Sequence, residues 1–537
     1  MTTVTINTLN EDWGNLSREL TAWLKQADQV IVSTTDADRN IAAIRGQFPT
    51  VDIVTMPHGE HPGHSPLGSF MQLNNAMQHV KGDWWCFASG NDYVYPNKIA
   101  TELATAKRTG ALVVYSDFNY TDESGKVKSR QRFKPYDAKA HEHTNIIPDC
   151  SLIHRSIIDR FGPFRCGKYR NYSYWDMWLR ARKELGQRIF AHNAVPTWGY
   201  RQGSADMHVK RERSPQMNAD AMIDRYRMLT DNGITQTAPV VSFCVEDHAN
   251  FMYENSRALD AVGIPNKAYK LTPHPYGYEQ QADVVPMAEV INAVKSAKIV
   301  QVFFSLKSFN LLKPYLKGKH VVMYYAGSEF RQNKAAYLRA INPHVTRSVI
   351  ALGEFNNCGA KNQRYVSVTV DVDALAKHVR PISDARKVGH YPSNPQVKGT
   401  EAIRRALGDR AIDIDTELLP YPKALERMAD CDIYIELFAG TQGKEVYGSF
   451  GTTAVEAAAM GKVVITMNLH DRFYTQEYGQ CPLILVQTEA DLRLAVDTLR
   501  ALPLEALQRI ADAQRAWATR YHSYLATGQR MIDQVLF

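Results

Sequence analysis

The chain has 537 residues, 45% of them hydrophobic and 22% charged, which is too long for one hydrophobic core and predicts several domain-sized units. The formal net charge of +7 permits an anionic substrate, an anionic membrane surface or DNA, and selects none of them. The sequence contains no run of 18 apolar residues and no secretory signal, so we expect a cytoplasmic protein without a membrane span. The seven cysteines are scattered and form no CxxC pair, which argues for reduced thiols and against a zinc site.

The first part of the chain alternates apolar, β-branched runs with segments of helical spacing. These patterns predict buried strands at 29–33, 51–55 and 111–116, a hairpin turn at 122–125, and helices at 13–26, 175–185 and 206–232. A second alternation starts at 239–245. It predicts further strands at 299–304, 320–324, 348–351, 365–370, 432–437, 463–466 and 483–486. Alternation of this kind predicts doubly wound, parallel sheets.

The most informative motif of the N-terminal part spans residues 73–96. A helix that carries Asn74 leads through a Gly-Asp turn into an apolar strand at 84–88, and a polar run follows that ends in Asn91 and Asp92. Open α/β sheets bind their ligands at the carboxyl ends of such strands. The motif resembles the donor-sugar site of family 2 glycosyltransferases, which have the GT-A fold.

This resemblance implies a Mg²⁺ or Mn²⁺ ion that carboxylate oxygens hold and that neutralises a nucleotide diphosphate leaving group. Here Ser89 and Asn91 stand at the first two acidic positions of the family pattern, and only the third, Asp92, keeps its carboxylate. The implied metal site therefore consists of Asn91 and Asp92, with weaker ligands than in the family. Asn74 falls in the register of a donor contact.

Three more residues follow from the same resemblance. Asp36 and Asp38 lie where a strand-end aspartate contacts the nucleotide base in the family, and a solvated loop carboxylate is the alternative for each. Asp176 is the candidate catalytic base, which would deprotonate the acceptor hydroxyl. A strict alignment on the Trp-Leu-Arg run that follows puts Tyr174 at the base position, so a charge that complements the helix dipole is the alternative for Asp176.

The C-terminal part contains two motifs that suit a phosphate ligand. The first runs from His390-Tyr391-Pro392-Ser393 to Lys398-Gly399-Thr400, and the second is a glycine-rich turn, Gly448 to Gly451, that leads into a helix with Glu456. Together they resemble family 4 glycosyltransferases of the GT-B fold. The resemblance implies that Lys398 contacts the donor pyrophosphate, that Gly448 and Gly451 form the phosphate loop, and that Glu456 accepts hydrogen bonds from the ribose. A surface lysine and an ordinary βα turn are the alternatives.

Two weaker segments resemble the same family. Gly327 and Arg331 follow a predicted strand in a G-S-[D/E]-x-R pattern, which implies that Gly327 lies close to the donor and that Arg331 offsets pyrophosphate charge. Lys444 and Glu445 precede the glycine-rich turn and are implied phosphate or sugar contacts, with a solvated loop charge pair as the alternative. The resemblance implies no essential metal in this part.

The two resemblances together imply an α/β chain with a GT-A domain at 1–234 and a GT-B domain at 238–380 and 381–537, whose halves face each other across a cleft. The chain would be a hexosyl- or pentosyltransferase, bifunctional if both modules turn over. It would transfer sugar from a nucleotide-sugar donor to a hydroxyl of a glycan or lipid-linked glycan, in the cytoplasm or peripherally at the inner membrane face.

Two other functions stay open. One is a phage-type DNA glycosyltransferase that acts on a hydroxymethylated base in the host cytoplasm, which requires a basic groove and access to the base. The other is a non-catalytic glycan-binding scaffold, because a fold does not by itself imply activity.

Overall fold

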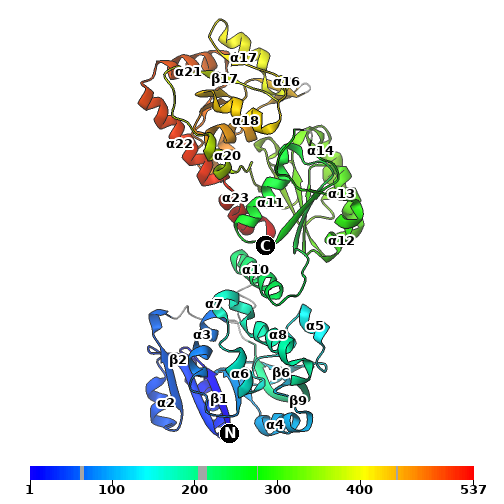
Figure 1. Ribbon diagram of the computed structural model, residues 1–537, viewed down its shortest axis with the longest axis vertical. Coiled ribbons are helices and arrows are strands. Elements are labelled where there is room, and N and C mark those ends of the chain that lie inside the picture. The colour runs from blue at the N-terminus through cyan, green and yellow to red at the C-terminus, as the bar shows by residue number, and fades with distance from the viewer. Residues whose placement is uncertain (61–65, 203–213, 275, 443–444) are drawn as a thin grey trace. The chain divides into compact units, whose positions relative to one another are not determined.

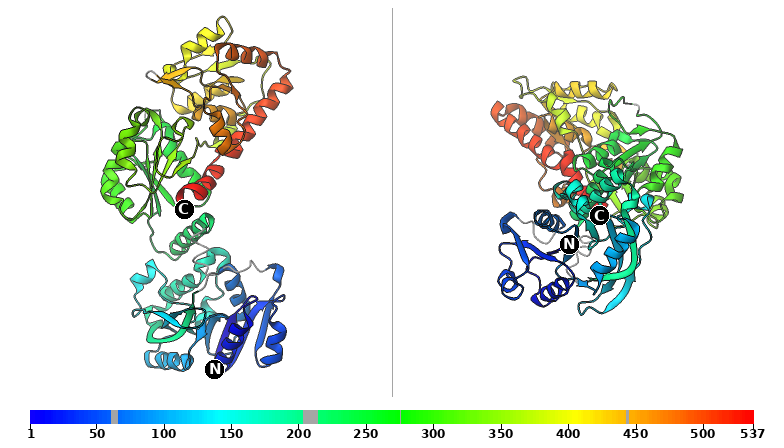
Figure 2. Two further views of the ribbon diagram at one scale, coloured as in Figure 1. Left: turned by 180° about the vertical axis from the view of Figure 1, so that it is seen from behind. Right: turned by 60° about the horizontal axis from the view of Figure 1, so that its bottom comes forward.

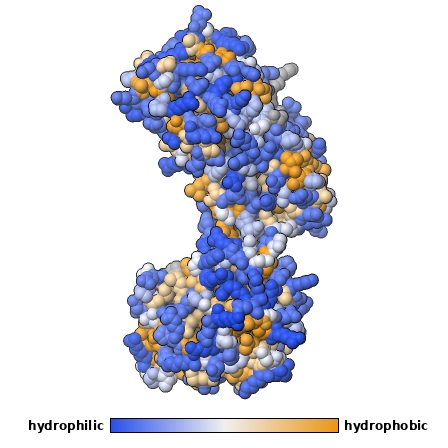
Figure 3. All heavy atoms as spheres, in the orientation of Figure 1, coloured by the Kyte–Doolittle hydropathy of each residue, from blue (hydrophilic) through white to orange (hydrophobic). Residues whose placement is uncertain are grey.

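The computed structural model forms two compact units, Met1–Gln236 (unit 1) and Thr237–Phe537 (unit 2), and Figure 1 labels some of their elements. It describes residues 1–60, 66–202, 214–274, 276–442 and 445–537. Both units combine strands with helices, so the predicted α/β class is confirmed. Hydrophilic residues predominate on the face of each unit drawn in Figure 3. Among the described residues, no helix is both long and apolar enough to cross a membrane.

In the described part of unit 1, nine strands form one sheet in the order β3-β2-β1-β4-β8-β6-β9-β5, with β7 beside β6. Strands β1 to β4 run parallel to one another, whereas β8 runs antiparallel to β4 and to β6. The strands are β1 (Thr2–Asn7), β2 (Gln29–Thr35), β3 (Asp52–Met56), β4 (Trp84–Ser89), β5 (Tyr93–Val94), β6 (Val113–Thr121), β7 (Val127–Gln131), β8 (Leu152–His154) and β9 (Phe190–Arg201).

The sheet of unit 1 is therefore mixed, although the alternation of strands and helices predicts a parallel one. The predicted turn at 122–125 is confirmed and explains part of the difference. The Asp122 carboxylate accepts hydrogen bonds from the backbone N–H groups of Ser124 and Lys126, each at 3.0 Å. This turn lets β7 return antiparallel to β6 without a crossover helix.

The helices of unit 1 form where apolar residues recur at helical spacing. In α1, Leu16, Leu20 and Trp23 are buried on one face, and the Asp12 side chain caps the first turn by accepting from Asn15 N at 3.1 Å. The helices are α1 (Trp13–Leu24), α2 (Ile41–Gln47), α3 (Pro66–Met77), α4 (Lys98–Thr109), α5 (Ala138–His143), α6 (Arg155–Phe161), α7 (Cys166–Tyr169), α8 (Ser173–Leu185) and α10 (Pro215–Asp231).

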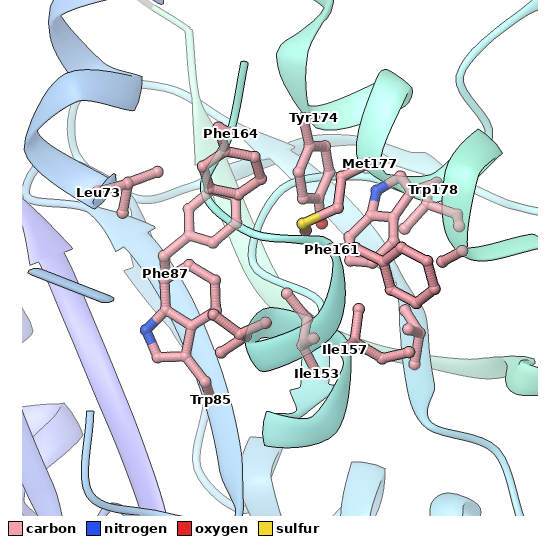
Figure 4. Close-up of a cluster of buried hydrophobic side chains, with 14 of the residues drawn as sticks. Leu73, Trp85, Phe87, Ile153, Ile157, Phe161, Phe164, Tyr174, Met177 and Trp178 are labelled. Carbon is pink, nitrogen blue, oxygen red and sulfur yellow. The ribbon is translucent and has the colours of Figure 1, made fainter. Parts of the chain in front are cut away.

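An aromatic cluster joins β4 to α8 in the core of unit 1. Figure 4 shows Phe87 of β4 beside Phe164 and Tyr174, with Trp178 further along the same cluster. The rings of Phe87 and Tyr174 meet edge to face at 5.2 Å, and those of Tyr174 and Trp178 at 4.8 Å. Burying each such side chain stabilises the fold by about 1.5–3 kcal/mol. The cluster therefore fixes β4, which leads to Asp92, and α8, which carries Asp176.

Unit 2 contains two parallel sheets, one in each half. The described strands of the first half have the order β12-β11-β10-β13-β14-β15-β16, and those of the second half β18-β17-β19-β22-β23, beside a hairpin of β20 and β21. The strands are β10 (Val240–Cys244), β11 (Asn266–Lys270), β12 (Asp283–Val284), β13 (Ile299–Phe303), β14 (His320–Tyr325), β15 (Arg347–Ile350), β16 (Gln363–Tyr365), β17 (Val388–His390), β18 (Asp413–Ile414), β19 (Ile433–Ile435), β20 (Gly440–Gln442), β21 (Glu445–Tyr447), β22 (Val463–Thr466) and β23 (Ile484–Leu485).

Helices cover both faces of the sheet in the first half of unit 2, with α11 on one side and α12 and α13 on the other (Figures 1 and 2). The helices of unit 2 are α11 (Phe251–Ala261), α12 (Met287–Ser296), α13 (Leu306–Leu312), α14 (Gly327–Ile341), α15 (Val372–Leu375), α16 (Pro395–Lys398), α17 (Thr400–Leu407), α18 (Tyr421–Ala429), α19 (Thr452–Ala459), α20 (Asp471–Tyr478), α21 (Glu489–Ala501), α22 (Leu504–His522) and α23 (Tyr524–Met531).

The C-terminal helices connect the two halves of unit 2. Helix α22 packs on α19 and β22 of the second half, and α23 packs on α11 of the first half. The Tyr524 hydroxyl donates to the Glu254 carboxylate at 2.6 Å, and Val370 N, between the halves, donates to His522 O at 3.0 Å. The chain therefore ends by returning to the half in which unit 2 begins.

One predicted strand of unit 2 is shorter than expected. The run 365–370 alternates like a strand, but β16 ends at Tyr365. The residues that follow are buried and bond to the second half, where Ser367 N donates to the Tyr478 hydroxyl at 2.8 Å. Burial between the halves, and not a sheet, accounts for the apolar pattern of this run.

Candidate functional site

The second half of unit 2 brings Lys398, Gly451 and Glu436 together at the carboxyl end of β19. Lys398 Nζ donates to Glu436 Oε1, and the same oxygen accepts from Gly451 N and from Thr453 Oγ1, each at 3.3 Å. Thr466 Oγ1 donates to the other carboxylate oxygen at 2.7 Å. The Glu436 side chain is 0% exposed and that of Lys398 is 13% exposed. Four donors from three separate segments of the sequence thus surround one buried carboxylate.

Glu436 does not figure among the residues that the sequence motifs single out. It lies in the strand run 432–437, where a carboxylate interrupts apolar residues. An acidic side chain at a position that should be buried is the signal that would have pointed to it, because buried charges need partners. The partners themselves lie far along the chain.

Close backbone packing fixes Lys398 in this arrangement. Gly399 follows it with a φ of +72°, and a Cβ atom there would lie 1.8 Å from the carbonyl oxygen of Phe438. His390 ties the same region together, since its ring nitrogens lie 2.8 Å from Ile435 O and 2.9 Å from Thr400 Oγ1. Burial lowers the pKa of His390 to about 4. The first family 4-like motif thus includes a structural histidine beside its lysine.

Glu456 lies on α19, one turn after Gly451, and is 6% exposed. Burial raises its pKa, and a hydrogen bond from Tyr421 and the attraction of Lys398 partly offset that rise. The Tyr421 hydroxyl donates to Glu456 Oε1 at 2.7 Å, and Tyr421 N donates to Tyr276 O of the first half at 2.9 Å. The Tyr421 ring lies 4.5 Å from that of Tyr278. Glu456 therefore lies where the two halves of unit 2 meet.

Arg331 and Gly327 come from α14 of the first half. Gly327 has a φ of +80°, which suits glycine at this strand-to-helix turn. Arg331 forms a bidentate ion pair with Glu354, with Nε 3.0 Å from Oε2, and its guanidinium lies 5.2 Å from the centre of the Tyr447 ring. Its side chain is 5% exposed. Arg331 thus contacts the segment that leads into the glycine-rich loop, and Glu354 already balances its charge.

The glycine-rich loop is held from the side by Leu469. Leu469 N donates to Gly448 O at 2.8 Å, and a Cβ atom on Gly448 would lie 2.4 Å from the Leu469 side chain. Gly448 therefore stands where a larger side chain would disturb the loop, whereas a Cβ atom on Gly451 would make an ordinary contact, 3.5 Å from Lys398 Nζ. Lys444 lies outside the described residues, as does the side chain of Glu445, and their roles stay predictions.

In unit 1 the predicted base-binding residues occupy different environments. Asp38 is buried and accepts hydrogen bonds from Thr34 Oγ1 at 2.5 Å, Asn10 N at 2.9 Å and Asn40 N at 2.8 Å. This is the bonding of a carboxylate that stabilises its own loop. Asp36 is exposed and accepts from His58 N at 2.8 Å. Of the two, Asp36 is the one that a ligand can reach.

Asn74 is committed to the backbone of Phe164. Its amide nitrogen donates to Phe164 O at 2.8 Å, and its amide oxygen accepts from Phe164 N at 2.7 Å. The side chain thus clamps the loop that precedes α7. Its contact with a donor stays a prediction. Such a contact would require the two hydrogen bonds to Phe164 to break or to become bifurcated.

The polar run after β4 presents one carboxylate. Ser89 Oγ donates to Asn91 Oδ1 at 2.7 Å, and Arg201 N donates to Asp92 Oδ1 at 3.1 Å. Burial raises the pKa of Asp92 to about 7. No group of three or more His, Cys, Asp or Glu side chains in the described residues is arranged to hold a metal ion. One carboxylate that resists ionisation is a poor ligand set for Mg²⁺ or Mn²⁺, so we assign no metal-dependent step to unit 1, and the metal site stays a prediction.

Glu19 of α1 is a second carboxyl group beside Asp92. It is 1% exposed, and its interaction with Asp92 and its burial both raise its pKa, burial more strongly, to about 8. Both carboxyl groups therefore keep protons in the folded state that the unfolded chain releases at a lower pH. The stability of unit 1 is expected to fall as the pH rises from about 4 to 8.

We expect Glu19→Gln to stabilise unit 1 in alkaline solution. The substitution removes a buried charge, so its thermal unfolding midpoint should exceed that of the wild type by roughly 5 °C at pH 8.5, and the gap should narrow at pH 5, where Glu19 is protonated. Circular dichroism at both pH values measures this. Glu123→Gln, at an exposed turn position, is the control and should leave both midpoints unchanged. An equal gap at the two pH values would contradict the prediction.

The predicted base, Asp176, is buried within α8. Its side chain is 0% exposed, and Arg165 makes a bidentate contact with it. Arg180 Nε donates to Oδ2 at 3.0 Å, and Asn232 Nδ2 donates to Oδ1 at 2.9 Å. A general base must come within hydrogen-bonding distance of the proton that it removes. This arrangement favours a structural ion network over a base, and a catalytic role of Asp176 stays a prediction.

Known proteins that resemble this chain are found among solved structures. No family model and no curated protein matches it. Among solved structures, HepE of Anabaena in complex with UDP and glucose is 14% identical with a TM-score of 0.38, over 54% of this chain and 98% of that chain.

Two other solved structures are also similar to this chain. Sucrose-phosphate synthase of Thermosynechococcus elongatus is 13% identical with a TM-score of 0.38, over 55% of this chain and 97% of that chain. TarS 1-349 of S. aureus in complex with UDP is 12% identical with a TM-score of 0.32, over 42% of this chain and 64% of that chain. Similarities of this size do not establish a function, which therefore rests on the site itself.

Proposed function

We propose that the chain is a glycosyltransferase and that unit 2 binds its nucleotide-sugar donor. The observation that carries the proposal is the convergence of Lys398 Nζ, Gly451 N and Thr453 Oγ1 on one point at the start of α19. A lysine, a helix N-terminus and a hydroxyl are the groups that bind phosphate oxygens. Glu456, one turn further along α19, is an acceptor for ribose hydroxyls. Together these groups suit a nucleoside diphosphate, which carries both phosphates and a ribose.

The chemistry follows from where charge develops. When the sugar leaves the donor, negative charge grows on the diphosphate, and groups that are already oriented stabilise it without reorganisation. Lys398 and the first N–H groups of α19 supply that stabilisation, which requires no metal ion in unit 2. The Tyr421 hydroxyl is hydrogen-bonded to the Glu456 carboxylate in the present structure. When a ribose binds, this hydroxyl has to move away or share the carboxylate with the ribose.

A glycan or lipid-linked glycan is the acceptor that we favour over DNA. The exposed basic run at 126–132 is partly neutralised, because Lys128 pairs with Asp122 at 3.0 Å and Arg130 with Asp117 at 2.8 Å. A DNA-binding surface needs unpaired cations to release counterions from the duplex. The second basic run, 210–213, lies outside the described residues. We propose that unit 1 has the GT-A-like role of binding sugar or acceptor, and that turnover belongs to unit 2.

An assay of sugar transfer from a donor to an acceptor tests this function. The full chain is incubated with UDP-, GDP-, ADP- and dTDP-sugars and with oligosaccharide, lipid-linked and hydroxymethylated DNA acceptors, and products are measured by mass spectrometry. We expect a glycan acceptor to gain a hexose or a pentose. A mass gain on DNA alone would select the DNA alternative. If no acceptor gains mass and no donor binds, the non-catalytic scaffold remains.

We expect Glu456→Gln to weaken donor binding by about 10- to 100-fold, because it removes a charged acceptor of ribose hydrogen bonds. Calorimetric titration of the donor into the variant measures this. Glu505→Gln, an exposed change on α22, is the matched control and should bind like the wild type. Undiminished donor affinity in Glu456→Gln would contradict the role of Glu456.

A further inference from the structure

Glu436 places a negative charge next to the position where the proposed function puts a phosphate oxygen. Its Oε1 atom accepts from the ammonium of Lys398, from the backbone of Gly451 and from the hydroxyl of Thr453. These donors define an anion hole, and a carboxylate of the chain itself fills its buried end. Because Lys398 is more exposed than Glu436, an approaching ligand meets the ammonium first and the carboxylate behind it.

The structure holds Glu436 in this place firmly. Its backbone N–H donates to Ile465 O at 2.9 Å, between β19 and β22. Its second carboxylate oxygen accepts from Thr466 Oγ1 at 2.7 Å. The side chain is 0% exposed, so it has no solvent to rotate into. A ligand therefore binds in the presence of this carboxylate and does not replace it.

The pair of Lys398 and Glu436 has no net charge, and this affects ligands of different charge unequally. A nucleotide sugar carries two phosphates that are both esterified, whereas the nucleoside diphosphate left after transfer ends in a phosphate whose last proton dissociates with a pKa of about 6. Above pH 7 the product thus carries about one negative charge more than the donor. A lone lysine would bind the product more tightly, and a neighbouring carboxylate cancels that preference.

We propose that Glu436 is a specificity-determining residue that removes the affinity advantage of the nucleoside diphosphate product over the sugar-linked donor and so promotes product release. This inference rests on the proposed donor site. Product release limits the turnover of many enzymes, and a transferase whose leaving group is more charged than its substrate benefits from such a carboxylate. Glu436 acts through Lys398 and through charge, without contact with the reacting atoms.

The test compares two ligands that differ by one charge and lack a sugar. The wild type is first titrated with UDP, GDP, ADP and dTDP at pH 8, and the tightest is compared with the methyl ester of its terminal phosphate. We expect the wild type to bind both within about 2-fold of each other. In Glu436→Gln the free diphosphate should bind about 5-fold more tightly than its ester, and it should inhibit turnover more strongly by the same factor. Glu426→Gln, exposed on α18, is the control and should behave like the wild type.

The outcomes separate the inference from the function on which it rests. If none of the four diphosphates binds the wild type or the variants, the proposed donor site is wrong. If they bind but the ratio is the same in folded Glu436→Gln and in the wild type, the inference alone is wrong. If Glu436→Gln does not fold, the binding ratio of the wild type decides. A wild type that binds the free diphosphate 5-fold or more tightly than its ester overturns the role of Glu436. Near-equal binding of the two ligands by the wild type supports that role.

Discussion

Replacing Lys398 by methionine is expected to abolish donor binding, with a loss of at least about 100-fold in affinity. The ammonium is the cation of the anion hole, and without it the buried carboxylate of Glu436 repels a diphosphate. The same change leaves that carboxylate without its cation. Removing one partner of a buried ion pair costs about 3–5 kcal/mol, so unit 2 should also unfold at lower denaturant. Calorimetry for binding and urea unfolding for stability measure the two effects.

A double variant separates these two effects of Lys398. Lys398→Met combined with Glu436→Leu removes both charges, and replacing a buried ion pair by apolar side chains is often neutral for stability. We expect the double variant to unfold close to the wild type and still to bind no donor. Lys387→Met, whose lysine pairs with Asp413 at a half-exposed position, is the control and should bind normally. Donor affinity within 3-fold of the wild type in Lys398→Met would refute the phosphate role.

The second large effect concerns Asp176, whose replacement by asparagine is expected to destabilise unit 1 by about 3–5 kcal/mol. The carboxylate is 0% exposed and balances Arg165 and Arg180. An amide has no charge to offset two guanidinium groups, and one of its ends donates where the carboxylate accepts. Asp159→Asn, at a position 61% exposed, is the control and should change stability by less than about 0.5 kcal/mol.

This variant also decides whether Asp176 is part of a structural ion network or acts as a catalytic base. Thermal unfolding of Asp176→Asn and assays of sugar transfer are made at a temperature where the variant is folded. If the ion network is its role, unfolding shifts and any remaining transfer per folded molecule is unchanged. A variant that is as stable as the wild type but has lost transfer would instead support the catalytic base that the sequence resemblance implies.

Several features of this protein can be predicted from local patterns because their causes are local. Apolar, β-branched runs predict β13 and β22, and helical spacing predicts α1 and α8. The turn at 122–125 follows from Asp122 and the backbone groups just after it. The convergence of Lys398 with the glycine-rich loop could be anticipated from the resemblance, since both segments follow strands of one parallel sheet and the carboxyl ends of such strands meet at one edge.

Other features depend on partners that are distant in the chain. The role of Glu436 requires Lys398, 38 positions away, and that of Asp176 requires Asn232, 56 positions away. Tyr421 and Glu456 are 35 positions apart. No local pattern reports such a contact, and a carboxylate looks the same in the sequence whether it binds a ligand, a metal ion or an arginine. The mixed sheet of unit 1 is a similar case, because strand order is set by how the whole sheet packs.

The sequence by itself thus determined the α/β class, many of the strands, several of the helices, and the segments where a phosphate site was to be sought, because these follow from periodicity and from short-range backbone chemistry. The tertiary structure alone decided which charges are balanced. It paired Asp176 with arginines, set Glu436 against Lys398 and placed Tyr421 on Glu456. The physical reason is that the state of a buried charge depends on its desolvation and on its nearest partners, and both are properties of the folded chain.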